Sequence, residues 1–522
     1  MIKKAAILFT AIFSLIFFSA TASFSADENY VKSEQARLAP YLSKTDLSEL
    51  VHYSDYNIYY DEKLLYNPTA KQLIEKINSA QEHAKQSNVA VSYYEYRNIL
   101  KTMTPNDFYY MFLAYRLSET GFFSLAEKAM SNVKDREIWE HHISSIKKYE
   151  FPILSLKTPE EVFFAELMAD IIYNNMTDES LKRIDKADKA LVNSDYASYI
   201  RAKAYFAEKK HKKALNEINR AISKNENKAD YIKFKAEIQN DIGNQKDALK
   251  TLKKINEREI ILAETHKDID IIKYYALSNS SKKESESKYY LAYYFYLNKD
   301  YQRAINELNG LMLKGENKQA PELLGYLYIL TGKMQEAQKL YEKCLLKNTK
   351  AAFAHKGLGD IFLYQKNYEK ALDEYKLAYK YNKKDIETLV ALTVTNYIIK
   401  DEKETAKYLK KAQKKDPKNF KVLYLTSQIA KDPKTVKESI KYNPFYPEGW
   451  LDLAQTSLQN NDLKNAEQYI NAAAFITKRS PRYFYYKSIL NTKKGNIETA
   501  QTDIERAAAL AVEKGKVPHE QI

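Results

Sequence analysis

The stretch LGDIFLYQKNYEKALDEYKLAYKYN, residues 358–382, places small and large side chains on a regular schedule. Gly359, Ala371 and Ala378 are small, whereas Phe362 and Tyr375 carry rings. Small side chains are needed where two helix backbones nearly touch, and bulky side chains fill the remaining holes. Such a schedule becomes evidence for a fold when it returns at a fixed period.

The schedule returns in steps of 34 residues. With Ala352 counted as position 1, the diagnostic residues fall at positions 8, 20, 24 and 27. Ten units keep this phase, and they begin at Asp107, Glu161, Asp195, Ala229, Ser285, Lys318, Ala352, Ile386, Pro447 and Pro481. A degenerate unit around 73–106 and a shortened unit around 420–446 add two more.

This pattern resembles the tetratricopeptide repeat (TPR) family, over about four fifths of the mature chain. The family favours Leu and a small residue at positions 7 and 8, Ala at 20 and 27, and Pro near 32. The resemblance implies an all-α, right-handed α-solenoid of about ten to twelve TPR-like helix pairs that share a continuous core. Position 11 is polar at Gln239, Asn396 and Asn491, where looser packing is expected.

Within one unit we expect two antiparallel helices. Gly359 is expected to face Ala371, and Ala378 is expected to pack on the next unit. Turns are expected between the two helices, as at Gly121 and Gly332, because glycine readily adopts the left-handed conformation that ends a helix.

The phase divides the chain into segments. We expect a signal peptide (1–26), an N-terminal cap or arm (27–72), a first array (73–262) with an inserted helix near 140–160, an insertion (263–284), a second array (285–516) and a frayed tail (517–522). The N-terminal segment is expected to lie against the first helices as a cap, or to serve as a partner-binding arm.

The first residues predict export. Lys3 and Lys4 precede an apolar run at 5–18, and small residues follow at Ala20, Ala22 and Ala26. This is the pattern of a cleaved signal peptide, whereas an uncleaved anchor needs a longer apolar run. We expect a bacterial protein that is periplasmic or secreted, with no membrane span after signal cleavage.

Net charge and cysteine content limit the classes of partner that we expect and the ways in which the fold can be stabilised. The net charge is +14, which permits attraction to an anionic polymer, but we favour solvated helix faces and expect no nucleic-acid partner. Cys344 is the only cysteine, so no internal disulfide is possible, and its small position in the repeat predicts a core residue.

No catalytic or metal-binding motif is convincing. The glycines at 310 and 315 are spaced like those of a phosphate loop, but Glu316 and Asn317 stand where Lys and Ser or Thr are required. His141 and His142 are adjacent, so on a helix they point about 100° apart and do not converge on a metal ion. We expect no enzyme activity, no cofactor and no metal.

The candidate binding residues follow from the resemblance. In this family the first helix of each unit lines the concave face, chiefly through positions 2, 5, 9 and 12. Carried over, these positions give an aromatic surface with scattered lysines: Tyr115, Tyr196, Tyr199, Lys203, Phe206, Tyr289, Tyr293, Tyr296, Tyr326, Phe353, Lys356, Tyr397 and Tyr485. The alternative interpretation is that individual rings pack between neighbouring helices.

Such a face suits an extended peptide, a partner helix or a glycan chain. The sequence therefore predicts an exported, non-catalytic scaffold that binds a protein or peptide partner, with envelope assembly or secretion as its setting. The alternative is a polysaccharide-binding or export accessory protein of the bacterial envelope.

Overall fold

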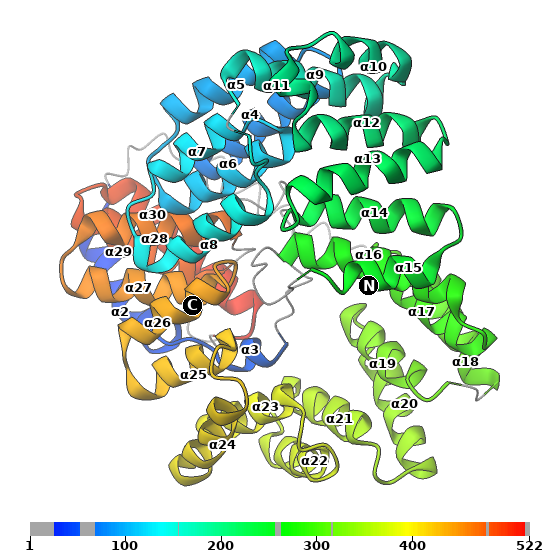
Figure 1. The fold of residues 1–522 in the computed structure, drawn as a ribbon. Coiled ribbons are helices and arrows are strands. Elements are labelled where there is room, and N and C mark those ends of the chain that lie inside the picture. The colour runs from blue at the N-terminus through cyan, green and yellow to red at the C-terminus, as the bar shows by residue number, and fades with distance from the viewer. Residues whose placement is uncertain are drawn as a thin grey trace, which may run out of the picture. The chain divides into compact units, whose positions relative to one another are not determined.

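A computed structural model describes residues 26–52, 68–154, 156–255, 263–314, 317–476 and 480–516. Every regular element in these ranges is a helix, from α2 to α30, and none is a strand (Figure 1). The all-α fold class expected from the repeat pattern is therefore confirmed. The expected signal peptide up to residue 25, part of the N-terminal arm and the tail at 517–522 lie outside the described residues.

Most helices alternate as first and second helices of repeats. In chain order they are α4 (Pro68–Lys85), α5 (Val89–Thr102), α6 (Asp107–Thr120), α7 (Phe123–Ser131), α9 (Thr158–Tyr173), α10 (Thr177–Asp185), α12 (Asp195–Ala207), α13 (His211–Lys224), α14 (Ala229–Asp241), α15 (Gln245–Leu252), α17 (Glu284–Leu297), α18 (Tyr301–Lys314), α19 (Ala320–Leu330), α20 (Met334–Lys347), α21 (Ala352–Tyr364), α22 (Tyr368–Tyr381), α23 (Ile386–Ile398), α24 (Glu402–Lys415), α25 (Phe420–Ala430), α26 (Pro433–Tyr442), α27 (Pro447–Gln459), α28 (Leu463–Ile476), α29 (Pro481–Lys493) and α30 (Ile497–Glu513). The others are α2 (Glu28–Leu42), α3 (Ser48–His52), α8 (Arg136–Tyr149), α11 (Lys189–Val192) and α16 (Ala263–Ser280).

The turn between the two helices of a repeat confirms the phase of the pattern. In each of the ten units the residue at position 15 has a positive φ, from 55° to 86°. Glycine takes this position at Gly121, Gly243, Gly332 and Gly495, and lysine or asparagine takes it in the other six units. The left-handed conformation at this position ends the first helix and turns the chain back.

Two glycines and one tyrosine show how the schedule works. A Cβ atom added at Gly325 would lie 2.3 Å from the Tyr341 ring, and one added at Gly357, in the next repeat, would lie 2.3 Å from the same ring. The Tyr341 ring is therefore packed between the backbones of two first helices. In the same unit as Gly357, the atoms nearest to a Cβ added at Gly359 belong to Tyr375, at 2.6 Å, rather than to Ala371 as expected. The small residue at position 8 therefore leaves room for the ring at position 24 of the same unit.

The described chain forms two compact units. The larger unit comprises residues 45–456 and 468–478, and the smaller unit comprises residues up to 44, 457–467 and 479 onwards. No helix in the described ranges is long and apolar enough to cross a membrane.

Within the larger unit, helices far apart in sequence are in contact. Helix α8 packs against α26, as Figure 1 shows. The Trp139 and Trp450 rings stack with centroids 5.9 Å apart, and the Phe112 and Phe475 rings approach to 4.6 Å. Residues from the beginning and the end of this unit therefore share one aromatic cluster.

In the smaller unit, α2 packs against α29 and α30. Val31, Leu38 and Leu42 of α2 are buried, and Arg482 Nε donates to the Leu42 carbonyl oxygen at 3.2 Å. Helix α2 thus packs on the α29–α30 pair, and the expectation that the N-terminal segment caps the first helices stays a prediction. Helix α2 covers part of the α29–α30 pair in the way that a neighbouring repeat would.

Candidate functional site

The structure distributes the predicted binding residues unevenly between interior and surface. Tyr115, Tyr196, Tyr296 and Tyr485 are buried, and only Tyr397 is exposed, at 42%. The remaining residues are half-buried: Tyr199, Lys203, Phe206, Tyr289, Tyr293, Tyr326, Phe353 and Lys356. The four buried rings pack inside the protein in this structure.

The predicted residues of α12 pack against the next repeat. The Tyr199 ring lies 4.9 Å from Tyr231 between centroids, and Phe206 lies 5.4 Å from Phe234. The Lys203 ammonium sits 3.7 Å from the centre of the Phe234 ring and 4.0 Å from Glu237. Burial lowers the pKa of Lys203, although Glu237 acts in the opposite direction. This part of the predicted surface is largely occupied by contacts within the protein.

The charged groups nearby are also paired. Lys233 contacts Asp230 at 2.9 Å and Asp268 at 3.7 Å, and Lys228 donates to the Glu150 carbonyl oxygen. Burial raises the pKa of the Glu150 carboxyl group, and Asp230 raises it further. These paired groups form a network between repeats.

The predicted tyrosines of α17 form a ring cluster with their neighbours. The Tyr293 ring stacks on Tyr274 at 4.0 Å, and the Tyr296 ring meets Tyr326 edge-on at 5.8 Å. Burial raises the pKa of the Tyr289 hydroxyl group. Tyr296 is buried and the other rings are half-buried, and together they link α16, α17 and α19.

A third set of predicted residues lies on α21 and α23, and α25 continues it. We call the surface formed by these three first helices the α21–α25 surface. It carries two ion pairs, Lys356–Asp360 at 2.8 Å and Lys421–Glu387 at 2.7 Å. Its apolar members include Leu363, Val390 and Val394, at positions 12, 5 and 9 of their repeats. These are the positions that the resemblance assigns to the binding face.

Residues 45–52 of the same chain lie on this surface; we call them the internal segment. It includes α3, which packs against α21 and α23. Leu47, Leu50 and Val51 are buried and belong to one apolar cluster with Leu363 and Val390. The His52 ring meets Tyr364 edge-on at 6.4 Å.

A polar contact fixes the beginning of the internal segment. The Thr45 hydroxyl group lies 2.9 Å from the Tyr424 hydroxyl oxygen and donates to Asp452 Oδ1 at 3.1 Å. Tyr424 and Gln428 also donate to Asp452 Oδ2, at 2.5 Å and 2.6 Å. The segment is thus held by an oriented hydrogen bond as well as by apolar contact.

Sequence reasoning missed this interaction. The available signal was the spacing of Leu47, Leu50 and Val51, three and then one residue apart, behind Asp46. That spacing is typical of one apolar face on a short helix. It predicts an amphipathic turn but does not indicate which surface the turn contacts.

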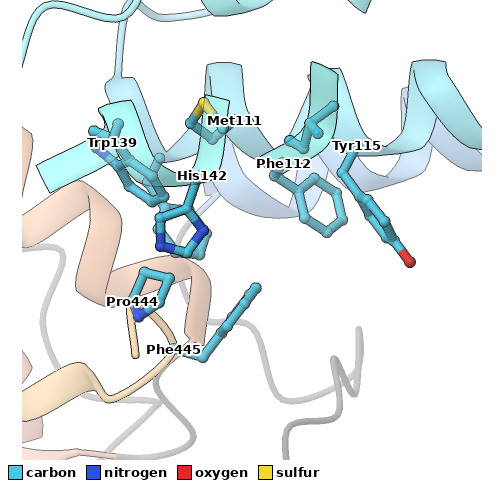
Figure 2. Close-up of a pocket in the computed structure, with 9 residues that line it drawn as sticks. Met111, Phe112, Tyr115, Trp139, His142, Pro444 and Phe445 are labelled. Carbon is cyan, nitrogen blue, oxygen red and sulfur yellow. The ribbon is translucent and has the colours of Figure 1, made fainter. Parts of the chain in front are cut away.

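The larger unit also contains an apolar pocket (Figure 2). Its empty space is about 400 Å³ when the open solvent at its mouth is included. It is lined from α6, α8 and the residues after α26: Phe108, Met111, Phe112, Tyr115, Trp139, His142, Ile146, Pro444 and Phe445. His142 supplies a polar edge, and its Nε2 donates to the Lys441 carbonyl oxygen at 2.9 Å. Burial lowers the pKa of His142 to about 3, so the ring is neutral near pH 7 and already hydrogen-bonded.

The other residues singled out in the sequence for their chemistry are Cys344 and the two adjacent histidines. Cys344 is half-buried against Tyr341, and burial raises the pKa of its thiol. His141 and His142 lie on α8. Within the described ranges no three His, Cys, Asp or Glu side chains are placed to hold a metal ion.

Comparison with known proteins identifies the repeat. Residues 323–385 match the family model described as tetratricopeptide repeat. No curated protein matches the sequence. The family match spans α19 to α22, the repeats in which Tyr341 and Tyr375 pack against glycine.

Several solved structures are similar to parts of the chain. A tetratricopeptide repeat protein from Parabacteroides merdae is 16% identical, covering 43% of this chain and 93% of that chain, with a TM-score of 0.35. The APC/C hetero-tetramer Cut9–Hcn1 is 11% identical, covering 85% and 94%, with a TM-score of 0.35. YrrB, described as a TPR protein with an unusual peptide-binding site, is 15% identical, covering 40% and 97%, with a TM-score of 0.25.

Proposed function

We propose that this chain, which belongs to the tetratricopeptide repeat family, is a non-catalytic scaffold that binds a protein or peptide partner on the α21–α25 surface. The observation that carries the proposal is the seating of residues 45–52 on that surface. A surface that accepts a short helical segment of its own chain has the dimensions and chemistry needed for a similar segment of another protein.

The mixed character of the surface supports a peptide ligand. Buried aliphatic side chains on α21 and α23 provide apolar contact, and the Lys356–Asp360 and Lys421–Glu387 pairs lie on the same helices and α25. Tyr397 adds an exposed ring at position 12 of its repeat. Apolar anchors surrounded by charged groups are typical of surfaces that bind amphipathic helices.

The setting that we propose is the bacterial envelope, where the scaffold acts in assembly or secretion after export. This part of the proposal rests on the sequence of the first 26 residues, with their basic start, apolar run and small-residue cleavage site. Detection of the mature protein in a periplasmic or culture fraction, with its N-terminus near residue 27, tests it. Retention of the full chain in the cytoplasm would exclude this setting.

Site-specific photo-crosslinking in the native cell tests the binding surface. A photoreactive residue replaces Tyr397, which is 42% exposed on first helix α23, or Tyr94, which is 64% exposed on second helix α5. We expect the Tyr397 variant to capture a specific protein and the Tyr94 variant to capture little of it. Equal capture at both positions would exclude the proposed surface.

The same two variants also separate a protein partner from the glycan alternative. A captured protein should be digested by protease and should yield a defined peptide linked to α23. Saturable binding of a soluble envelope glycan that is abolished by Tyr397→Ala, without any captured protein, would favour the glycan.

A further inference from the structure

We propose that the internal segment, residues 45–52, is a built-in competitor that occupies the partner-binding surface, and that the partner carries a segment of the same chemistry. That chemistry is a hydroxyl side chain followed, two, five and six residues later, by apolar side chains. The inference rests on the proposed function, because it concerns the same surface.

The apolar part of this recognition comes from three side chains. Leu47, Leu50 and Val51 follow the i, i+3, i+4 spacing that places residues on one side of a helical turn. They share a cluster with Leu363 of α21 and with Val390 and Val394 of α23. The segment's three members of this cluster are all aliphatic, so another segment with this spacing would make equivalent apolar contacts.

The hydrogen bonds of Thr45 fix the direction in which the internal segment runs along the repeats. Thr45 binds both Tyr424 and Asp452, which come from α25 and α27. The hydroxyl anchor and the apolar residues therefore contact successive first helices, from α27 and α25 at the start of the segment to α23 and α21 beyond it. A partner segment would be expected to run along the repeats in the same direction.

The placement of the segment distinguishes it from an ordinary core element. The packing partners described for α3 are first helices, whereas each repeat is closed by its own second helix, as α21 is by α22 and α23 by α24. The segment thus lies on the face that the family uses for ligands. Because it is tethered, its effective concentration is high, and a free partner must compete with it.

Competition has a measurable consequence. The apparent affinity for a free peptide is reduced by the fraction of molecules in which the surface is available. Releasing the internal segment should restore the intrinsic affinity. The chain would then be a scaffold whose binding is restrained until a stronger ligand displaces its own residues.

The test uses the mature chain and a fluorescent synthetic peptide that spans residues 44–52. Leu50→Asp places a charge at a buried apolar contact and should release the internal segment without changing the repeats themselves. Leu346→Asp, at a position 88% exposed on α20, is the matched control. We expect roughly tenfold tighter peptide binding to the Leu50→Asp chain than to wild type, and unchanged binding to the control.

A variant of the surface shows where the peptide binds. Tyr424→Phe, added to the Leu50→Asp chain, removes the hydroxyl group that meets Thr45 and should weaken peptide binding about fivefold. A folded Leu50→Asp chain that binds the peptide no better than the control would overturn the inference. An affinity for the peptide that Tyr424→Phe leaves unchanged would also overturn the inference.

Hydrogen exchange covers the case in which Leu50→Asp fails to fold. An excess of unlabelled peptide added to the wild-type chain should speed amide exchange at residues 48–52 and leave exchange in α21 unchanged or slower. If exchange at residues 48–52 does not respond, the internal segment is a fixed part of the core. Light scattering would detect the remaining possibility, exchange of the segment between two copies, and a stable dimer would contradict a free-partner site.

Failure of this inference differs from failure of the proposed function. Suppose that wild type and the Leu50→Asp chain capture the same amount of a protein at position 397. The proposed scaffold function is then supported, and the proposed competition by the internal segment is contradicted. If nothing is captured at position 397 by either chain, the proposed function itself fails.

Discussion

The Nε2 atom of His142 donates a hydrogen bond to the carbonyl oxygen of Lys441 across 2.9 Å. These residues lie 299 positions apart in the sequence, on α8 and α26. A helix inserted between two repeats therefore contacts a repeat near the other end of the larger unit. The neutral ring is part of that contact, and the contact should respond to pH.

The stability of the larger unit should fall as the pH falls below the ordinary pKa of His142, because the unfolded chain then takes up a proton that the buried ring does not. Its folded-state pKa is about 3, below the ordinary value of 6.5, because the ring is buried. The unfolded chain therefore binds more protons between these two values, and folding is disfavoured as pH falls through that window. The contribution amounts to at most about 1.4 kcal/mol per pH unit.

The measurement is urea unfolding of wild type and His142→Gln between pH 7 and 4. Glutamine keeps a hydrogen-bond donor but does not titrate. We expect the free energy of unfolding of wild type to fall more steeply with acid than that of the variant. His141→Gln, a substitution of the adjacent ring, is the control; parallel curves for wild type and His142→Gln would show that His142 contributes no such slope.

The packing of Tyr341 predicts opposite effects for the same substitution at two glycines. Gly357→Ala would place a methyl group 2.3 Å from the Tyr341 ring and should lower the free energy of unfolding by about 1–3 kcal/mol. Gly310→Ala, inside α18 with no neighbouring atom within 4 Å, should raise it by about 1 kcal/mol through helix propensity. Thermal and urea unfolding measure both. A stabilising Gly357→Ala would contradict the account of how repeats pack.

The left-handed conformation at position 15 predicts opposite effects for Lys→Gly substitutions at a turn and inside a helix. Lys366 is exposed and has φ 59°, a left-handed conformation that costs a residue with a side chain about 1–2 kcal/mol. Lys366→Gly should therefore raise the free energy of unfolding by about 0.5–1 kcal/mol. Lys376→Gly, at an exposed position inside α22, should lower it by about 1 kcal/mol. The same sign for both variants would show that backbone conformation does not decide the outcome.

The contact between Thr45 and Tyr424 should control how firmly the internal segment is held. Thr45→Val keeps the shape of the side chain but removes its hydrogen bonds to Tyr424 and Asp452. Amide exchange at Leu50 and Val51 should accelerate about fivefold, which corresponds to about 1 kcal/mol. Thr502→Val, at an exposed site on α30, is the control; unchanged exchange in Thr45→Val would mean that the hydroxyl group contributes nothing to docking.

Much of the fold could be predicted from the sequence because the repeat acts through local packing. Helices α6, α12, α14, α21, α23, α27 and α29 begin at the residue counted as position 1 of their units. The regular turn at position 15 follows from the same phase. Each of these features depends on residues within one repeat or between neighbouring repeats, so a period of 34 residues carries the information.

Contacts between distant residues could not be predicted in this way. Tyr115 and Tyr397 both stand at repeat positions assigned to the binding face, yet Tyr115 is buried near α8 and Phe445 whereas Tyr397 is exposed. The period cannot distinguish them, because burial depends on helices that are far away in sequence. The same reason explains why the positions of α2 and α3 were not predicted. The spacing of their apolar residues indicates that each helix has an apolar face, but it does not indicate which surface that face contacts.

The most direct test of the central claim is amide hydrogen exchange of the full chain with and without the partner captured at position 397. The account predicts slower exchange in α21, α23 and α25, with faster exchange in residues 48–52 as the internal segment leaves. Slower exchange confined to the second helices α22, α24 and α26, or to the smaller unit, would contradict the claim that the α21–α25 surface binds the partner.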